Sequence, residues 1–444
     1  MTAGNPMSLI IGFAIPLIMG SIFQQLYNLV DTIIVGKYLG LSALSAVGST
    51  GSVTFLILGF CMGMCQGFGI PVAQKFGAQR YDSMRKYIAN ASYLARGMSA
   101  VITVRTVLLC RTILTVMKTP ADIIDGSYAY LVIIFAGIPF TVLYNTLSSF
   151  IRALGDSKTP FKFLVLSAVL NVILDLVFII VLKIGVAGAA YATIISQAVS
   201  GILCLIYMKN RYPVLKFEKG ELAIVGRKMR KLCMMGLPMG LQFSITAIGT
   251  VMLQSAVNSL GTVYVASYTA TQKIKQFAMA PFDGFASASA TFVSQNLGAG
   301  NLDRIPQGVK SATIVSEIYG FVVGLIFMTV GGRLALIFVD AAEVEVLSLV
   351  TLNLKCVSFF FMIVAALNVI RMSVQGLGYS GLAMIAGLSE LIARGVMALF
   401  VIPATGYIGV CFTDQTAWIA ATVVVSVEFL AIMKKLRAAK SAKA

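Results

Sequence analysis

The sequence predicts an all-α integral membrane protein in which twelve transmembrane helices form two parallel six-helix repeats. Three observations support this fold class: an apolar composition, a series of segments of membrane-spanning length, and a duplication that halves the chain. Of the 444 residues, 58% are hydrophobic and only 11% are charged, whereas soluble domains contain roughly 25% charged residues. The composition therefore excludes an ordinary soluble domain.

Twelve apolar segments recur along the chain, and each is long enough to cross a hydrocarbon layer of about 30 Å as a helix. Their approximate bounds are 8–36, 44–71, 87–116, 124–151, 160–182, 186–208, 230–259, 263–294, 308–338, 345–374, 380–402 and 406–433. Weak period-2 alternation and the segment lengths argue against a transmembrane barrel. No basic region and cleavage site frame the first segment as a signal peptide, so we expect it to be a transmembrane helix.

Charged residues predict the orientation of these helices. The net charge is +17, but Lys and Arg lie mostly between alternate apolar segments, which indicates cytoplasmic loops and no nucleic-acid partner. The run "KNRYPVLKFEKGELAIVGRKMRK" and the tail "KKLRAAKSAKA" are the most basic examples. Both termini are therefore expected in the cytoplasm of a bacterial or archaeal cell, with the protein in its inner membrane. The seven scattered cysteines include no CxxC pair, so we expect neither a disulfide nor a metal site.

A duplication divides the chain at its one long polar connection. The loop "VAQKFGAQRYD" (72–82) matches "VSQNLGAGNLD" (293–303), "RALGDS" (152–157) matches "QGLGYS" (375–380), and Pro16 matches Pro238, so the offset between the halves is nearly constant. We therefore predict an N-lobe at 1–208, a cytoplasmic linker at 209–229 and a C-lobe at 230–444. Six spans per half make the repeats parallel, which is a transporter architecture suited to alternating access around a site near the bilayer midplane.

These motifs resemble those of the multidrug and toxic compound extrusion (MATE) family. The resemblance rests on "IPLIMGSIFQQLYNLVDTIIVGKYLGLSALSAVG", on the two repeated loops "QKFGAQRYD" and "SQNLGAGNLD", and on "RALGDSKTP". It covers essentially the whole chain and is most similar to the DinF-like branch. The resemblance implies a V-shaped antiporter that exports organic cations or amphipathic drugs in exchange for Na⁺ or H⁺.

Polar residues in the N-lobe form the main candidate site. An acid within the bilayer costs about 3 kcal/mol on insertion scales, so Asp31 is expected to have partners and a function. Asn171 and Asp175 lie four residues apart and share a helical face, and Thr193 lies on the next predicted helix. In the family, residues at these positions form a cation site to which the backbone carbonyl at the position of Ala189 also belongs. The oxygen ligands suit Na⁺, and the paired carboxylates could equally store a proton.

Several other residues are weaker candidates. Asn145, Tyr27 and Asn28 could extend the site, and Tyr27 and Asn28 are also candidates for a drug cavity. Such residues also link membrane helices without touching a ligand. Pro16 removes a backbone hydrogen bond from the first helix, which favours a bend there; in the family a proline at this position is associated with bending of that helix. A structural network that only holds helices together is the alternative for the whole cluster.

The C-lobe is expected to differ from the N-lobe. Leu253 and Ala398 occupy the repeat positions of Asp31 and Asp175, so the site cannot be copied. Glu390 and Arg394 lie four residues apart, and we interpret them as a self-contained ion pair, with a role in gating or coupling as the alternative. The following residues share one face of a C-lobe helix and are candidates for a drug cavity: Gln272, Gln276, Met279 and Asp283.

The predicted function is secondary active multidrug efflux, driven by Na⁺ or H⁺ through alternating access. The alternative is a flippase of the same superfamily fold that moves a lipid-linked precursor. Such a protein would need a cationic cavity for a phosphate head group. An enzyme is not expected, because the chain has no histidine, no nucleotide-binding loop and no nucleophile beside a base. We expect a monomer that needs no cofactor beyond the coupling ion and no metal beyond Na⁺.

Overall fold

The computed structural model describes residues 1–442, and these contain helices but no strand. The helices before the linker are α1 (Pro6–Leu39), α2 (Leu41–Gly77), α3 (Tyr81–Val116), α4 (Ile124–Ala136), α5 (Ile138–Ala153), α6 (Lys158–Leu176), the π-helix η1 (Val177–Val181) and α7 (Val186–Arg211). A short 3₁₀ helix, η2 (Pro213–Leu215), lies in the linker. The second half contains α8 (Gly226–Asn258), α9 (Thr262–Gly298), α10 (Arg304–Ala335), α11 (Val344–Ser358), α12 (Phe361–Gly376), α13 (Ser380–Val396), the π-helix η3 (Met397–Val401), α14 (Ile402–Thr405) and α15 (Tyr407–Ser441).

Each of the twelve predicted spans is helical, which confirms the fold class. Within residues 1–442, nine helical spans are long and apolar enough to cross a membrane, and two bent pairs pass the same test together. The pairs are α4 with α5, bent by 45°, and α11 with α12, bent by 55°. The twelfth span, α9, has 37 residues but carries Lys273, Lys275 and Asp283, so its length rather than its apolarity identifies it.

The two halves repeat the same irregularities. Gly137 separates α4 from α5, and Phe359 lies at the corresponding break between α11 and α12. The π-helices η1 and η3 follow α6 and α13 in the same way. Because a break and a π-bulge each need a local departure from α-helical hydrogen bonding, their recurrence confirms the duplication.

The chain divides into two compact units, although not at the predicted lobe boundaries. The first unit is Met19–Gly240, and the second unit combines Met1–Ile18 with Leu241–Ala444. The start of α1 thus packs with the second half of the chain, while the linker and the start of α8 pack with the first half. Both helices pass from one unit to the other two residues after a proline, Pro16 in α1 and Pro238 in α8.

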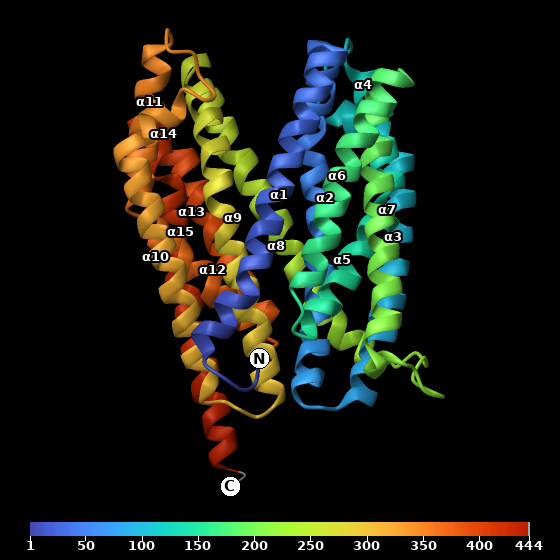
Figure 1. The fold of residues 1–444 in the computed structure, drawn as a ribbon. Helices are drawn as coiled ribbons and strands as arrows, with labels where there is room; N and C mark the ends of the chain where they lie inside the picture. The colour runs from blue at the N-terminus through green and yellow to red at the C-terminus, as the bar shows by residue number, and fades with distance from the viewer. Residues whose placement is uncertain (443–444) are drawn as a thin grey trace. The chain divides into compact units, whose positions relative to one another are not determined.

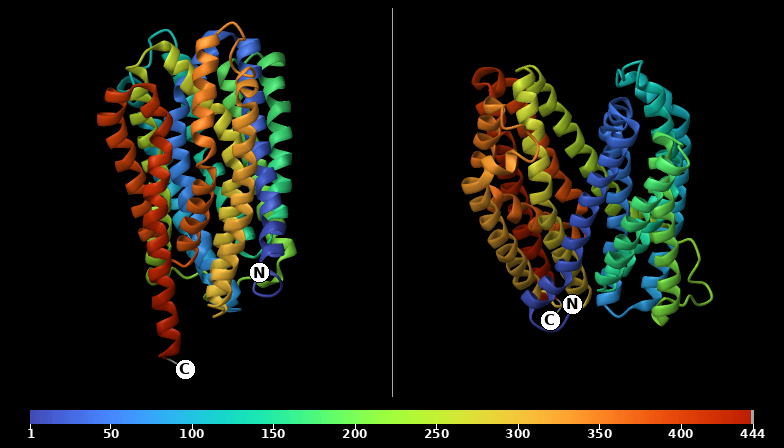
Figure 2. Two further views of the ribbon diagram at one scale, coloured as in Figure 1. Left: turned by 90° about the vertical axis from the view of Figure 1, so that its left-hand side faces the viewer. Right: turned by 45° about the horizontal axis from the view of Figure 1, so that its top comes forward.

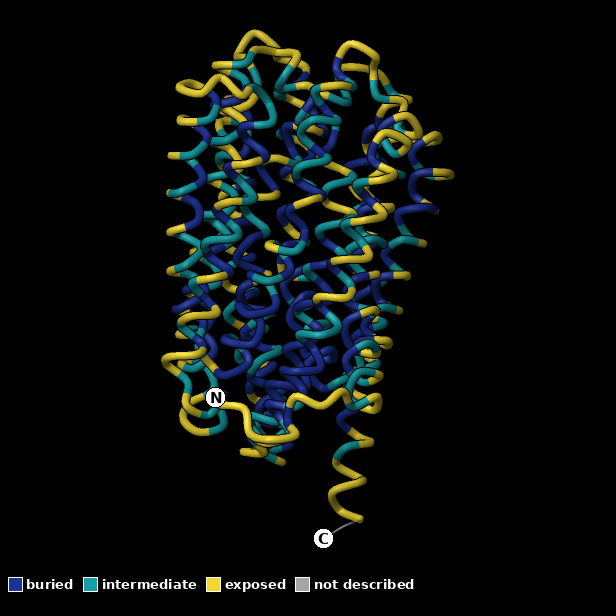
Figure 3. The backbone as a smooth tube through the Cα atoms, turned by 90° about the vertical axis from the view of Figure 1, so that its right-hand side faces the viewer, coloured by how far each residue is buried: buried dark blue, intermediate teal, exposed yellow. Residues whose placement is uncertain are grey.

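Each unit has its own apolar core, and the helices of each unit run side by side (Figures 1 and 2). In the first unit, Phe68, Phe135 and Phe150 are fully buried between α2, α4 and α5. In the second unit, the start of α1 contributes Ile10 and Phe13 to a core that lies mainly between α9, α10, α12 and α15. Exposed residues occur along the length of the helices (Figure 3). Many of them are large and apolar, as expected for surfaces that face lipid.

Glycines bring α2 and α8 into backbone contact within the first unit. A Cβ atom added to Gly67 would lie 2.6 Å from the Cα atom of Gly236, and one added to Gly63 would lie 2.5 Å from the carbonyl oxygen of Met239. Gly236 and Gly240 are four residues apart, as are Gly63 and Gly67, so each helix presents a small-residue face of the type that lets membrane helices approach closely. The contacts run in opposite directions along the two helices, so α2 and α8 are antiparallel.

Residues 212–225 of the linker, here called the strap, are bound to the first unit. Arg85 at the start of α3 forms ion pairs with Glu221, at 2.5 Å, and with Glu218, at 3.2 Å. The side chain of Asn90 donates to the carbonyl of Ala223 and accepts from the backbone N–H of Val225. These bonds hold the connection against α3 and fix where α8 begins.

A second set of bonds fixes the other end of the strap. Tyr212 donates to the carboxylate of Asp156, which also accepts from the backbone N–H groups of Lys158 and Thr159 and so caps α6. Burial alone would raise the pKa of Asp156, but the hydrogen bonds from Thr159, Tyr212 and Lys158 outweigh it and hold that pKa below its usual value. The motif "RALGDSKTP" is thus explained by helix capping and by linker attachment.

Candidate functional site

Asp31 and Asp175 form a carboxyl pair in the first unit. Asp31 lies on α1 and is half-buried, and Asp175 lies at the end of α6 and is fully buried. The two carboxyl groups are within hydrogen-bonding reach of each other, so one proton shared between them would complete a bond. Among residues 1–442, no side chain or backbone group donates to either oxygen of Asp175 or to Oδ1 of Asp31.

The other predicted oxygen ligands lie beside this pair on α6 and α7. Asn171, one turn before Asp175, is 2% exposed and its amide lies 3.5 Å from the hydroxyl of Thr193, to which it donates. Thr193 in turn donates to the backbone carbonyl of Ala189 at 3.0 Å. The side-chain amide oxygen of Asn171 accepts no hydrogen bond from the described chain. Neighbouring helices therefore bring together the four predicted side chains and the predicted carbonyl.

The electrostatics of this cluster are unusual for a membrane interior. In the part of the chain that the structure describes, the only charged neighbour that interacts strongly with either carboxyl group is the other carboxyl group. No ion pair within residues 1–442 includes Asp31 or Asp175. Two buried acids without a base repel each other when both are ionised, so at least one must be protonated or bound to a cation. The donor set of carboxylate, amide, hydroxyl and carbonyl oxygens fits a hard cation such as Na⁺.

Two tyrosines lie near the carboxyl pair, and the sequence predicted only one of them, Tyr27. Tyr27, one turn before Asp31, and Tyr130 on α4 both interact electrostatically with the two acids. Tyr130 was missed because nothing in the sequence relates α4 to α1 and α6. The other two weak candidates are different: Asn28 is exposed, and the amide of Asn145 donates to the carbonyl of Thr141 on its own helix at 2.8 Å.

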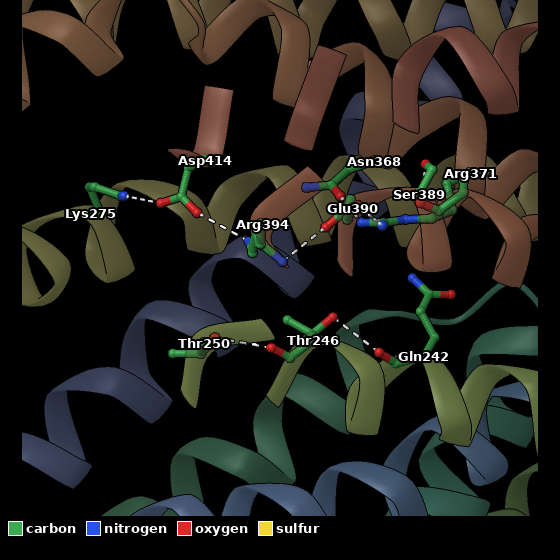
Figure 4. A network of polar contacts seen from close by, with 11 residues as sticks. Gln242, Thr246, Thr250, Lys275, Asn368, Arg371, Ser389, Glu390, Arg394 and Asp414 are labelled. Atoms are coloured by element: carbon green, nitrogen blue, oxygen red, sulfur yellow. Dashed lines mark hydrogen bonds and ion pairs between the residues drawn. The ribbon is translucent and has the colours of Figure 1, made fainter. Parts of the chain in front are cut away.

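In the second unit, Glu390 and Arg394 belong to a longer charge chain, so the predicted self-contained pair is wrong. The chain consists of Lys275, Asp414, Arg394, Glu390 and Arg371, in that spatial order (Figure 4). Glu390 contacts Arg371 at 2.6 Å and Arg394 at 3.4 Å. Asp414 contacts Lys275 at 2.5 Å and Arg394 at 3.4 Å. The pair is extended because α9, α12 and α15 each contribute a charge to the side chains on α13.

This charge chain alternates in sign and ends in a neutral partner. Arg371 donates its second guanidinium nitrogen to the side-chain oxygen of Asn368 at 2.6 Å. The side chains of Lys275, Glu390 and Arg394 are 5%, 7% and 9% exposed, so the chain is buried over most of its length. The sequence contained the signal, because Lys275 and Asp414 interrupt apolar segments, but no spacing rule connects charges on four separate helices.

The predicted drug-cavity residues share one side of α9. Gln272 and Met279 are half-buried, and Gln276 and Asp283 are exposed. Met279 packs against the apolar core of the second unit, and Asp283 interacts electrostatically with Arg371. A further amide pair, in which Gln375 on α12 donates to Gln242 on α8 at 2.7 Å, lies in the same unit.

Comparisons with known proteins agree with this geometry. The MatE family model matches twice, at residues 16–177 and 238–401, which again reports the duplication. The chain is 31% identical over 308 residues to the probable multidrug resistance protein YpnP of Bacillus subtilis (strain 168), covering 68% of each chain. It is 28% identical over 340 residues to the probable multidrug resistance protein YoeA of the same organism, covering 74% of this chain and 73% of YoeA.

A solved structure described as MATE in complex with MaL6 shares the fold. Its TM-score is 0.92 at 22% sequence identity, and the match covers 98% of each chain. Helices, repeat and family match thus lead to the same conclusion: the chain is a multi-pass membrane protein that belongs to the MatE family, whose members are transporters and not enzymes.

Proposed function

We propose that the protein is a secondary active multidrug efflux antiporter, which exports organic cations or amphipathic drugs in exchange for Na⁺ or H⁺. The observation that carries the proposal is the carboxyl pair, Asp31 with Asp175, which has no basic partner among residues 1–442. Such acids are costly inside a membrane and mark ion or proton pathways. The similarity to two probable multidrug resistance proteins supports drugs as the cargo rather than a lipid-linked precursor.

In this mechanism the carboxyl pair exchanges its cation or proton with the cargo. Arrival of the coupling ion removes the repulsion between Asp31 and Asp175 and stabilises the conformation in which α1 and α6 lie together. Departure of the ion restores the repulsion and favours the alternative state, so each ligand shifts the equilibrium by its difference in affinity for the two states. Pro16 lies where α1 passes from the second unit to the first, which is where a change in the direction of α1 would act.

The face of α9 that carries Gln272, Gln276, Met279 and Asp283 is our proposed contact surface for the drug. Its half-buried and exposed residues combine an apolar, adaptable side chain with amide and carboxylate groups that could orient a cationic cargo.

The test is transport into proteoliposomes that contain the purified protein, with Na⁺ and pH gradients imposed separately. Uptake or release of a fluorescent organic cation should follow one of the two gradients and should collapse when that gradient is dissipated. Transport that ignores both gradients, or that requires ATP, would contradict the proposal.

We further propose that both termini and the strap face the cytoplasm, because the basic loops lie on alternate connections. Position 220 lies in the exposed turn of the strap. A cysteine introduced there, in a chain without its native cysteines, should resist an impermeant thiol reagent in intact cells and react after permeabilisation. Ready labelling of intact cells would reverse the topology.

A further inference from the structure

Four lysines converge at one end of the first unit, and the transport mechanism does not use them. This lysine cluster consists of Lys75 at the end of α2, Lys86 in the second turn of α3, and Lys228 and Lys231 at the start of α8. All four residues are half-buried. Lys228 interacts electrostatically with each of the other three lysines, and Lys231 interacts with Lys75.

The helix crossing explains why they meet. The backbone contact between Gly67 and Gly236 fixes α2 against α8 in antiparallel orientation. Lys75 lies eight residues after Gly67, and Lys228 lies eight residues before Gly236, so both lie about 12 Å from the crossing towards the same end. The helices α3 and α8 both begin there, and the positive ends of their dipoles add to the charge.

Carboxylates of the described chain do not neutralise this cluster. No ion pair within residues 1–442 includes any of the four lysines. Asp82 attracts Lys228 and Glu221 attracts Lys86 at longer range, but the side chain of Asp82 is exposed and Glu221 is already bound by Arg85. Lys228 is positioned by its hydrogen bond to Ser83 and by the ring of Tyr87, 4.4 Å away.

The repeat shows that the fold does not require these charges. The positions that correspond to Lys75 and Lys86 are Asn296 and Gln307, and those that correspond to Lys228 and Lys231 are Pro6 and Leu9. In place of the cluster, Arg304 donates to Asn296 and to the carbonyl of Gly4. Neutral side chains therefore suffice at the four equivalent positions of the repeated architecture.

We propose that the lysine cluster is a binding site for the phosphate of an anionic phospholipid head group. Four ammonium groups from three helices provide charge and hydrogen-bond donors for a phosphate. Their place at the ends of three membrane-spanning helices puts them at the depth of the head groups, where each lysine contributes to attraction by anionic lipid. A soluble phosphate compound has the same chemistry but no acyl chains to hold it beside the apolar helices.

The test uses three forms of the purified, full-length protein in detergent: wild type, a cluster variant and a charge-matched control. The cluster variant carries Lys→Gln at 75, 86, 228 and 231, and the control carries Lys→Gln at 158, 162, 209 and 216, which are exposed lysines of the same unit. Each is titrated with a fluorescent phosphatidylglycerol, and phosphatidylcholine and inorganic phosphate serve as competitors.

The expected result is a Kd for phosphatidylglycerol that rises about fivefold for each cluster lysine removed, with the control close to wild type and no competition by phosphatidylcholine. Equal weakening in the cluster variant and the control would show attraction by overall charge and overturn the proposal. Displacement of the lipid by inorganic phosphate at equal concentration would assign the site to a soluble phosphate ligand instead. If the fourfold variant does not fold, Lys231→Gln is compared with Lys209→Gln, and an unchanged Kd for Lys231→Gln overturns the proposal. Failure of transport in proteoliposomes would leave this result untouched, because the titration does not depend on transport.

Discussion

The membrane-spanning helices of the two units hold buried acids in opposite ways. In the first unit, Asp31 and Asp175 face each other with no base of the described chain beside them, whereas in the second unit the acids Glu390 and Asp414 each lie between two cations. The helices that carry Asp175 and Glu390, α6 and α13, occupy the same place in the repeat. One architecture can therefore hold acids either neutralised, which favours a fixed structure, or unneutralised, which leaves them available to an ion.

The largest effect is expected at the unneutralised acids. Asp31→Asn and Asp175→Asn should each abolish gradient-driven export while leaving a folded protein, because the amide is nearly isosteric and removes a buried charge. The double variant should be no worse than either single one, since residues that act as one unit are not additive. Drug resistance in a pump-deficient strain, with membrane abundance measured alongside, is the assay.

Asp122→Asn, at an exposed position, is the matched control and should keep full resistance. Normal abundance together with full resistance in both site variants would mean that the cluster only holds helices together, and the difference between the units would lose its functional meaning.

The charge chain should respond through folding rather than through transport alone. Asp414→Asn leaves the buried Lys275 without its carboxylate and deprives Arg394 of one of its two, so we expect a loss of about 3–5 kcal/mol in the free energy of unfolding. Adding Lys275→Met should recover part of it, because the stranded ammonium is removed. Thermal unfolding of the detergent-solubilised single and double variants measures both effects. If the single variant has the melting temperature of wild type, the ion pairs of this charge chain do not stabilise the fold.

A smaller effect is expected at the helix crossing of the first unit. Gly67→Ala places a Cβ atom against the backbone of Gly236, and overpacking of this kind costs about 1–3 kcal/mol. Gly48→Ala on the same helix meets no atom within 4 Å and should be neutral or slightly stabilising. If both variants unfold at the same temperature, α2 and α8 can separate without cost.

The smallest effect concerns the strap and depends on pH. The hydrogen bond from Arg85 holds the pKa of Glu221 below its ordinary value of 4.5. A carboxyl group whose pKa is lowered by folding stabilises the folded protein at pH values above its ordinary pKa. This contribution disappears as the pH falls through the lowered pKa. Wild type should therefore have a higher melting temperature than Glu221→Gln at neutral pH. The difference in melting temperature should close as the pH falls below 4.5. A gap of constant size would assign the effect to packing.

Much of the fold could be predicted because membranes restrict the choice of structure. The length of the apolar segments located every span, including α9, even though the charges of Lys273, Lys275 and Asp283 make α9 less apolar than the other spans. The unit boundaries could not be predicted, because residues 6–18 and 19–39 adjoin within the continuous helix α1 and only tertiary packing assigns them to different units.

The two candidate sites also differ in how far the sequence could predict them. Asn171 and Asp175 share a helical face, so their spacing predicted that they would meet a partner, and Thr193 and Asp31 lie beside them. Glu390 and Arg394 were also recognised as neighbours by spacing, but Arg371, Lys275 and Asp414 are 19 to 139 residues away from their partners. Such contacts depend on how helices are arranged, which local periodicity does not encode.

Because α1 and α8 each pass from one unit to the other, this chain resembles a domain-swapped dimer whose two subunits are fused into one polypeptide. Each half donates the opening turns of its first helix to the other, and the boundaries, after Ile18 and after Gly240, correspond in the repeat. Fusion of two copies of a six-helix ancestor that exchanged this segment would leave this connectivity. A cut in the linker would therefore not release two independent bodies: each fragment would lack the turns that complete its own core, and the two would have to be produced together to assemble.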